Sequence, residues 1–531
     1  MRVLLLSMPD SFEHTPALTM RMPNGALASL AGNVGAGHQV AIADLILVQN
    51  RVVPTVERLV RDWEPDVVGL SVMTFQRRTA LRLVRVIRAI KPGVVIVAGG
   101  YDPSLAPEAY EAPSSGIDYI VRGEGEVTFR ALLATLKGRP TTASTALKGW
   151  TTTASTALKG WTTEGGDVSA IPGLSFRTSS TSGFHHAPAA PITRIEDGSL
   201  ALPNRSARVL QGYTFLGRPI DIVETSRGCT YDCSFCSIIE MRGRNFHTFD
   251  FTRVLADIAD ARARGARAIF IVDDNITLNI KRFEALCRAI VEAGLNDIHY
   301  IVQAMTSSIA NCGDSLPTLM RKAGFRYVFL GIENVLEEDL VFLRASAKNA
   351  RREGGRSAGN ATVAAIDKLH AAGLSVVGGI IVGNPNDTRE SIEANLTFAR
   401  KYVDWPYIQH PTPYPGTPMT AEFRTRGLVV NERVEEYDGT TAVVKTEHLE
   451  SDEIEFIRWR AERWMKMRHL PSVLRHYPRF VLRNAPRMCA HTFRGSSLRS
   501  LIGLESQRQV FARYKRLRAA EREYVSAVAA E

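Results

Sequence analysis

Two stretches of the chain show the same pattern, in which short apolar runs alternate with segments whose apolar residues recur every three to four positions. Continuous apolar runs are typical of parallel strands buried on both faces, and the segments between them are typical of the helices that cover such a sheet. Over residues 1–137 the alternation predicts a doubly wound, Rossmann-like α/β domain. Its expected strands are Val3–Ser7, Val40–Ala43, Val67–Val72, Val94–Ala98 and Ile117–Val121, with helices at Gly25–Ala36 and Arg78–Ile90.

The alternation resumes at residue 221 and supplies six further strands with helices between them. Six strand–helix repeats predict a (β/α)6 partial TIM barrel over residues 215–430, and chemistry in barrels gathers at the carboxyl ends of the strands. The expected strands are Asp221–Thr225, Ala268–Val272, His299–Gln303, Tyr327–Ile332, Ser375–Val382 and Tyr407–Pro411.

The remaining segments are a linker and a tail. Residues 138–214 form the expected linker, which contains an eleven-residue direct repeat, Thr141–Thr151 followed at once by Thr152–Thr162. Two short copies are too few for a solenoid, so a duplication within a tolerant surface loop is the preferred interpretation. Residues 431–531 are expected to form a helical, basic C-terminal region.

Charge is concentrated at the C-terminal end of the chain. The net charge is +10, and residues 461–531 alone contain 15 Arg and Lys against five Glu. Basic helices that also carry aromatic residues fit peripheral contact with an anionic membrane surface, a cap that closes the barrel, or an RNA surface. The cap is the preferred interpretation, and a nucleic acid partner is not expected because no nucleic-acid-binding motif is present. No apolar run approaches a membrane span, which predicts a cytoplasmic protein that is at most membrane-peripheral.

Three of the six cysteines, Cys229, Cys233 and Cys236, lie on one short loop after the first barrel strand. Thiolate sulfur suits iron–sulfur clusters or zinc, but a structural zinc site needs a fourth ligand nearby, and the next histidine, His247, lies eleven residues past Cys236. Three ligands without an obvious fourth favour a [4Fe–4S] cluster with one open iron, with zinc as the alternative. The scattered Cys287, Cys312 and Cys489 are expected to be buried structural thiols.

With Phe235 just before its last cysteine, this C-x3-C-x2-C loop resembles the cluster motif of the radical S-adenosylmethionine (AdoMet) enzymes. The resemblance implies that AdoMet binds the open iron, near Phe235. It also implies that Asp273 and Asp274 approach the AdoMet amino group, although the same sequence fits a helix N-cap. Glu333 would accept from the ribose, and Gly383 would lie against the adenine. Tyr414 is expected either to face the substrate or to pack inside the protein.

The first domain resembles the cobalamin-binding domain that precedes many radical AdoMet barrels. The resemblance rests on residues 23–25, 68–71, 98–100 and 121–126. It implies that one set of residues lines the corrin: Ser71, Met73, Thr74, Gly99, Gly100, Tyr101, Gly123 and Glu124. The D-x-H-x-x-G signature of an axial histidine is absent, because His14 has the wrong spacing from Asp10. An exposed loop histidine is the preferred interpretation of His14.

These resemblances imply a cobalamin-dependent radical AdoMet methyltransferase that methylates an unactivated carbon through a 5′-deoxyadenosyl radical and methylcobalamin. A cobalamin-dependent oxidative cyclase or ring-rearranging enzyme is the alternative within the family, and a cobalamin-binding regulatory protein is the alternative that is not an enzyme. The expected partners are a small-molecule or lipid substrate and a reducing protein such as flavodoxin or ferredoxin. Among substrates, a hydrophobic isoprenoid lipid such as a hopanoid is favoured over a natural-product intermediate.

Overall fold

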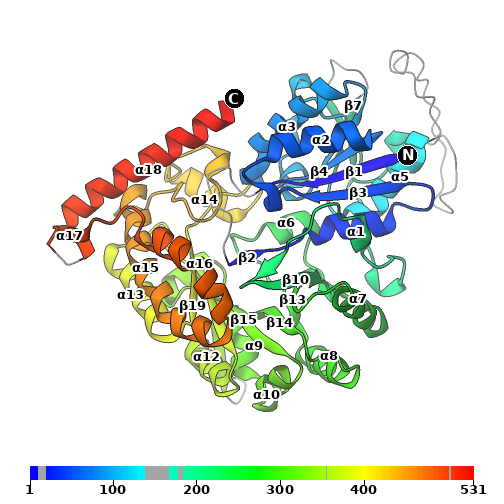
Figure 1. The fold of residues 1–531 in the computed structure, drawn as a ribbon. Helices are drawn as coiled ribbons and strands as arrows, with labels where there is room; N and C mark the ends of the chain where they lie inside the picture. Colours follow the sequence, from blue (N-terminus) through cyan, green and yellow to red (C-terminus); the bar gives the residue numbers. More distant parts are fainter. Residues whose placement is uncertain (10–18, 138–166, 178–182, 354–355, 502–503, 531) are drawn as a thin grey trace. The chain divides into compact units, whose positions relative to one another are not determined.

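The computed structural model describes residues 1–9, 19–137, 167–177, 183–353, 356–501 and 504–530 (Figure 1). His14 and the eleven-residue direct repeat lie outside these residues. The chain divides into two compact units, Met1–Asp10 with Asn24–Gln211, and Ser11–Pro23 with Gly212–Glu531.

The first unit contains a seven-stranded sheet in the order β3-β1-β4-β5-β6-β7-β8. The first five strands of this order are parallel, β7 runs antiparallel to β6, and β8 runs antiparallel to β7. The strands are β1 (Arg2–Ser7), β3 (Gln39–Asp44), β4 (Val67–Ser71), β5 (Val95–Gly99), β6 (Tyr119–Val121), β7 (Leu174–Arg177) and β8 (Phe184–His186). The helices are α1 (Gly25–Asn33), α2 (Val52–Trp63), α3 (Arg77–Ile90), α4 (Tyr101–Leu105) and α5 (Gly125–Lys137).

Strand β1 shows why the sheet is buried on both faces. Its alternate residues point to opposite sides: Leu4 and Leu6 join one apolar core, and Val3 and Leu5 join the other. The predicted Rossmann-like architecture is therefore confirmed. The chain begins at β1, adds β3 on one side of it, and then adds β4 and the following strands on the other side. Doubly wound sheets bind ligands at the carboxyl edge of such a switch point, here between β1 and β4.

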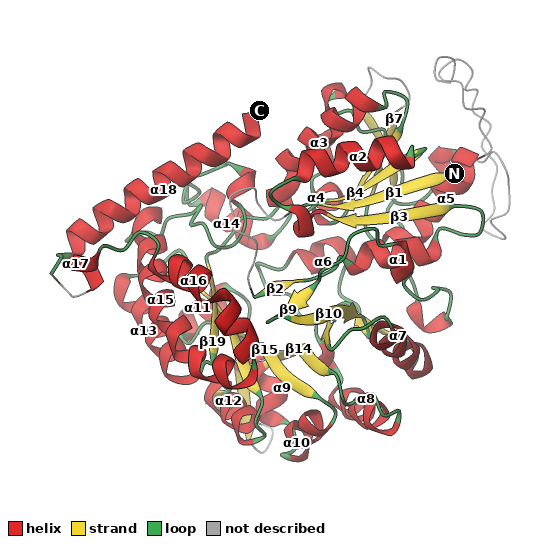
Figure 2. Cartoon of the chain, viewed as in Figure 1, coloured by secondary structure: helices red, strands yellow, loops and turns green. Residues whose placement is uncertain are grey.

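The second unit contains an eight-stranded sheet in the order β19-β18-β15-β14-β13-β10-β9-β2. Six strands are parallel and form the predicted partial barrel, and Figure 2 shows their helices outside the strands. The parallel strands are β10 (Arg218–Val223), β13 (Ala268–Ile271), β14 (His299–Met305), β15 (Phe325–Glu333), β18 (Ser375–Ile381) and β19 (Trp405–Gln409). The short strands β9 (Thr214–Phe215) and β2 (Met20–Arg21) extend the sheet antiparallel.

Helices follow most barrel strands and continue into the tail. Those of the barrel are α6 (Ser237–Arg242), α7 (Phe251–Ala263), α8 (Ile280–Glu292), α9 (Thr306–Asn311), α10 (Ser315–Lys322), α11 (Glu337–Phe342), α12 (Thr362–Ala371), α13 (Arg389–Tyr402) and α14 (Pro418–Thr425). Those of the tail are α15 (Ser451–His476), α16 (Pro478–Phe493), α17 (Leu498–Leu501) and α18 (Gln507–Ala530). Within the described residues, no helix has both the length and the apolar character needed to cross a bilayer.

The junction of α15 and α16 closes the amino end of the barrel. Tyr477 and Phe480 pack in one apolar cluster with Tyr327 of β15 and with Phe215. The rings of Phe215 and Tyr477 lie 6.4 Å apart, nearly perpendicular to each other. These tail aromatics form the floor of the barrel, as the cap interpretation expects.

Other aromatics of the tail pack within the tail itself. Tyr514 of α18 lies 5.4 Å from Phe456 and 4.9 Å from Trp459 of α15, measured between ring centroids. These rings are therefore used for internal packing. One expectation about the tail is wrong: Cys489 is exposed on α16, whereas Cys287 and Cys312 are buried as predicted.

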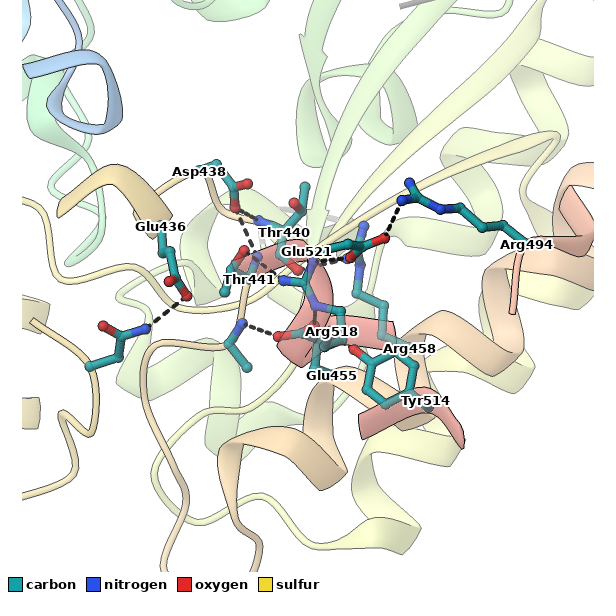
Figure 3. Close-up of polar contacts among 12 residues, drawn as sticks. Glu436, Asp438, Thr440, Thr441, Glu455, Arg458, Arg494, Tyr514, Arg518 and Glu521 are labelled. Atoms are coloured by element: carbon teal, nitrogen blue, oxygen red, sulfur yellow. Dashed lines mark hydrogen bonds and ion pairs between the residues drawn. The ribbon is translucent and has the colours of Figure 1, made fainter. Parts of the chain in front are cut away.

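A buried carboxylate fixes α18 against α15 and the loop before it (Figure 3). Glu455 of α15 accepts from the backbone N–H of Ala442 and from the Tyr514 hydroxyl, and the Arg518 Nε lies 2.5 Å from its Oε1. Arg518 also pairs with Glu521 at 2.8 Å. Because Glu455 is only 4% exposed, its charge depends on these partners.

We predict that Glu455→Gln releases α18. Breaking a buried ion pair costs about 3–5 kcal/mol, and the lower end applies because Arg518 keeps Glu521. Lys515→Ala, on the same helix, removes a partly exposed ion pair with Asp452 and should cost at most about 1 kcal/mol. Thermal unfolding and the rate of proteolysis within α18 provide the measurement. Equal effects of the two substitutions would contradict this role of Glu455.

Candidate functional site

The cysteine loop leaves the carboxyl end of β10 through the short strand β11 (Ser226–Arg227), which pairs with β12 (His247–Thr248). Gly228 then takes a positive φ of 89°. A Cβ at this position would lie 2.4 Å from Oδ1 of Asn245 and 2.5 Å from its carbonyl oxygen, so only glycine fits. The tight turn sends the chain directly into Cys229.

The middle of the loop is held by backbone hydrogen bonds to two distant segments. The N–H of Ser234 donates to the carbonyl of Leu343, and its hydroxyl donates to the carbonyl of Phe342. The carbonyl of Ser234 accepts from the N–H of Met419, at the start of α14. The loop between Cys233 and Cys236 is thus tied to the far side of the same barrel end.

Asp273 and Asp274, directly after β13, bind the start of the loop. Asp273 is fully buried and accepts from the backbone N–H of Thr225 at 2.6 Å and from the hydroxyls of Thr225 and Ser226 at 2.5 and 2.6 Å. Asp274 accepts from the N–H of Gly228 at 2.8 Å. Both carboxylates are engaged within the protein, on the segment that leads to Cys229.

Neither carboxylate caps a helix. The cap of the following helix, α8, is Asn279, whose side chain accepts from the N–H of Arg282. Asn275 turns its amide toward sulfur, 4.0 Å from Sγ of Cys229 and 3.8 Å from Sδ of Met305. Contact of Asp273 or Asp274 with the AdoMet amino group stays a prediction.

The three cysteines interact electrostatically. Burial raises the pKa of the Cys233 thiol to about 12, and Cys236 and Cys229 contribute to the rise, while the ammonium of Lys348 opposes it. Among the described residues, no three His, Cys, Asp or Glu side chains are grouped as ligands of a single metal ion. Three thiols on one loop fit a cluster in which each cysteine binds a different iron.

Glu333, the last residue of β15, pairs with Lys348, which the motif analysis missed. The Lys348 Nζ lies 2.6 Å from Oε1 of Glu333, and both side chains are largely buried. Lys348 also lies over Phe235, with its Nζ 5.9 Å from the ring centroid. Two predicted AdoMet residues, Glu333 and Phe235, therefore meet at Lys348 beside the cysteine loop, and the role of Glu333 toward ribose stays a prediction.

Gly383 and Tyr414 lie at the same end of the barrel. Gly383 follows β18 with φ +102°, and its N–H donates to Asp387 at 2.7 Å. Tyr414 is half-buried, donates its hydroxyl to the carbonyl of Tyr437, and packs against the same apolar cluster as Phe235. Packing thus accounts for Tyr414, and its contact with substrate stays a prediction.

The predicted corrin-lining residues gather at the carboxyl edge of the first unit's sheet. In the strand register, Ser71 lies beside Ser7 and beside Gly99, and Gly99 lies beside Val121. The loops after these strands carry the rest of the set: Met73, Thr74, Gly100, Tyr101, Gly123 and Glu124. At Gly100, with φ +101°, an added Cβ would lie 2.8 Å from the carbonyl oxygen of Val72, which explains the glycine.

Polar contacts stiffen this edge. Ser71 accepts from the amide of Asn24 at 3.3 Å, and Gly123 donates its N–H to Ser104 at 3.0 Å. Glu124 accepts from the N–H of Thr193 at 2.9 Å, whereas Met73 is exposed. The edge thus combines a fixed backbone with an exposed apolar side chain, which suits a flat macrocycle.

Comparisons with known proteins agree with both units. Residues 18–133 match the model of the B12 binding domain, and residues 223–399 match the model of the Radical SAM superfamily. The chain belongs to the B12-binding radical SAM family. Its cofactors are cobalamin, AdoMet and a [4Fe–4S] cluster, and the loop of Cys229, Cys233 and Cys236 fits the cluster because it offers three thiols and no fourth ligand.

Three curated relatives span most of the chain. An uncharacterized methyltransferase of Pyrococcus horikoshii is 26% identical over 86% of this chain and 90% of its own length. The hopanoid C-3 methylase of Methylococcus capsulatus is 25% identical over 72% and 65%. The anaerobic magnesium-protoporphyrin IX monomethyl ester cyclase of Rubrivivax gelatinosus is 25% identical over 91% and 78%.

One solved structure has a similar fold. It is the radical S-adenosylmethionine methyltransferase TsrM from Kitasatospora setae, which superposes with a TM-score of 0.61 at 19% identity. The match covers 81% of this chain and 79% of TsrM. Both units of the family architecture thus occur together in a known fold.

We predict that Asp273→Asn loosens the cysteine loop. An amide cannot accept all three hydrogen bonds that the carboxylate accepts, and leaving a buried donor unpaired costs about 1–3 kcal/mol. The variant should bind less iron per chain after anaerobic reconstitution and lose it faster to a chelator. Asp260→Asn, which alters a partly exposed pair with Arg264 on α7, is the control. Unchanged iron retention in Asp273→Asn would contradict an anchoring role.

Proposed function

We propose that this protein transfers a methyl group to an unactivated carbon atom of a hydrophobic small molecule. The observation that carries the proposal is the presence, in one chain, of a three-cysteine loop at the end of a radical SAM barrel and a B12-binding sheet. The names of two relatives, a methyltransferase and a hopanoid C-3 methylase, support methyl transfer. When bound, the cofactors supply a 5′-deoxyadenosyl radical from AdoMet and a methyl group carried on cobalt.

The residues of the chain would position the cofactors and exclude water from the reaction. Cys229, Cys233 and Cys236 would hold the cluster, and Glu333 and Gly383, at the same end of the barrel, would bind AdoMet. The aromatic floor built by Tyr477 and Phe480 keeps water from the amino end. A radical reaction needs such exclusion of water and close positioning more than it needs acid or base groups.

A hydrophobic substrate is supported by the aromatic lining of the barrel. Tyr327 packs against the floor, so Phe329, two residues further along β15, projects to the same side but nearer the carboxyl end. Its ring lies 5.6 Å from that of Tyr407 on β19, and it covers Gly379, where an added Cβ would lie 2.8 Å from the ring. Tyr407 is 43% exposed although it belongs to a barrel strand, so its ring is available to a ligand.

The aromatic lining also has one polar side. The amide Nε2 of Gln409 lies 3.3 Å from the hydroxyl of Tyr407 and donates to it. A substrate with an extended apolar surface and a single polar group fits this combination. A lipid of the isoprenoid class, such as a hopanoid, meets that description, and so does an apolar natural-product intermediate.

Cyclisation without methyl transfer is the second candidate. The relative from Rubrivivax gelatinosus that favours it is named a cyclase and covers 91% of this chain. Both reactions need a reducing partner, for which a protein of the flavodoxin or ferredoxin class is proposed. They differ in what becomes of the AdoMet methyl group.

We predict that anaerobically reconstituted protein, given reductant, AdoMet with a deuterated methyl group and a lipid extract of its source cells, yields S-adenosylhomocysteine and 5′-deoxyadenosine in equal amounts. The product should carry the deuterated methyl group when analysed by mass spectrometry. Cys233→Ala should abolish 5′-deoxyadenosine formation. Formation of 5′-deoxyadenosine without S-adenosylhomocysteine would refute methyl transfer and favour cyclisation.

Peripheral contact of residues 461–531 with an anionic membrane surface is also proposed, and within these residues we assign the contact to α16. Support comes from α16, on which Arg479, Arg483 and Arg487 recur every four residues beside Leu482, which is 73% exposed. These three arginines form no ion pair within the described part of the chain. A basic helix face with an exposed apolar residue suits an anionic bilayer surface.

We predict that replacing Arg479, Arg483 and Arg487 together by Gln weakens binding to phosphatidylglycerol vesicles about 100-fold, from about 1 kcal/mol per arginine. Vesicle co-sedimentation gives the measurement. Replacing Arg51, Arg58 and Arg61, around α2 of the first unit, removes the same charge and should leave binding unchanged. No binding by the unmodified protein, or equal binding to phosphatidylcholine, would exclude this contact.

A further inference from the structure

The Glu333–Lys348 pair requires a strained backbone conformation at Glu333. Glu333 has a φ of 59°, a left-handed conformation that side chains other than glycine rarely adopt. The register between β15 and β18 shifts at this point, between Gly331 and Glu333. Such strained positions persist only where the surrounding structure enforces them, and they concentrate at functional sites. The bulge turns the Glu333 carboxylate toward Lys348.

The neighbouring residues leave room for the pair. A Cβ on Gly331 would lie 2.8 Å from Oε1 of Glu333 and 3.6 Å from the Lys348 Nζ. Lys348 comes from a short 3₁₀ turn, Ser346–Asn349, whose start is fixed by the hydrogen bond from the Lys348 N–H to the carbonyl of Ala345. That turn follows the segment 342–343, which accepts two hydrogen bonds from Ser234 of the cysteine loop. The same backbone therefore holds both the ammonium and the cysteine loop.

The ammonium is placed to act on the thiolates. It lies over the ring of Phe235, between Cys233 and Cys236 in the sequence, with its Nζ 5.9 Å from the ring centroid. The carboxylate of Glu333, 2.6 Å from the Lys348 Nζ, stabilises the ammonium in this largely buried position. In a site that excludes water, one fixed charge acts strongly on its neighbours.

We propose that Lys348 is a positioning residue whose ammonium, held in place by Glu333, stabilises the reduced, more negative state of the cysteine-bound cluster and so raises its reduction potential. The cluster gains one electron on reduction, and a nearby positive charge favours that gain, whereas a carboxylate opposes it. Lys348 and Glu333 should therefore shift the potential in opposite directions. Their opposed effects distinguish this role from simple packing.

The test is a redox titration of the cluster in the full-length, reconstituted protein, followed by electron paramagnetic resonance, without AdoMet or substrate. Lys348→Met should lower the equilibrium constant for one-electron reduction by at least tenfold, which is about 59 mV. Glu333→Gln should raise this equilibrium constant. Lys348→Arg, which keeps the positive charge, should leave the constant within about threefold of that of the unmodified protein, or about 30 mV.

Lys368→Met is the matched control, because Lys368 pairs with Asp314 and donates to the carbonyl of Cys312. It should not move the potential. If Lys348→Met fails to hold a cluster, Glu333→Gln alone still tests the proposal. A reduction potential of Glu333→Gln that falls or stays constant would overturn it. The same shift in Lys348→Met and Lys368→Met would overturn it as well. Because no substrate is used, the result is separate from the outcome of the methyl transfer test.

Discussion

The hydrogen bonds from Thr225, Ser226 and Gly228 to the carboxylates of Asp273 and Asp274 are the constraint on which the site depends. The cysteine loop is short and polar and has no core of its own. Its position is therefore inherited from the neighbouring strands, because parallel pairing places Val223 of β10 beside Ile271 of β13. The register of one strand pair thus fixes where the loop begins, and the hydrogen bonds of Ser234 with Leu343 and Met419 fix its middle.

The second constraint is electrostatic. Three thiols, a carboxylate and an ammonium share a largely buried region, and burial alone would disfavour every charged form. The ion pair between Glu333 and Lys348 lets both charges persist there, and the strained backbone of Glu333 keeps the pair in one geometry. Packing of Tyr327 with the tail seals the opposite end of the barrel. Charge and water exclusion thus come from different parts of the same unit.

The sequence predicted the parts of the site that depend on local pattern. Apolar runs located the strands, and the spacing of Cys229, Cys233 and Cys236 indicated the cluster. Lys348 was out of reach because it lies fifteen residues from Glu333, in a turn without a motif, and only the bulge after Gly331 brings them together. Cys489 was misjudged because its apolar neighbours fit a buried face, and sequence does not tell which face of a helix has a partner.

The floor of the barrel has a kinetic consequence. With Tyr477 and Phe480 filling the amino end, that end provides no separate exit for products. A molecule that reaches the rings of Phe329 and Tyr407 would therefore enter at the carboxyl end, where the cysteine loop lies, and its product would leave by the same end. Shared entry and release would make the order of ligand exchange a consequence of the barrel's architecture.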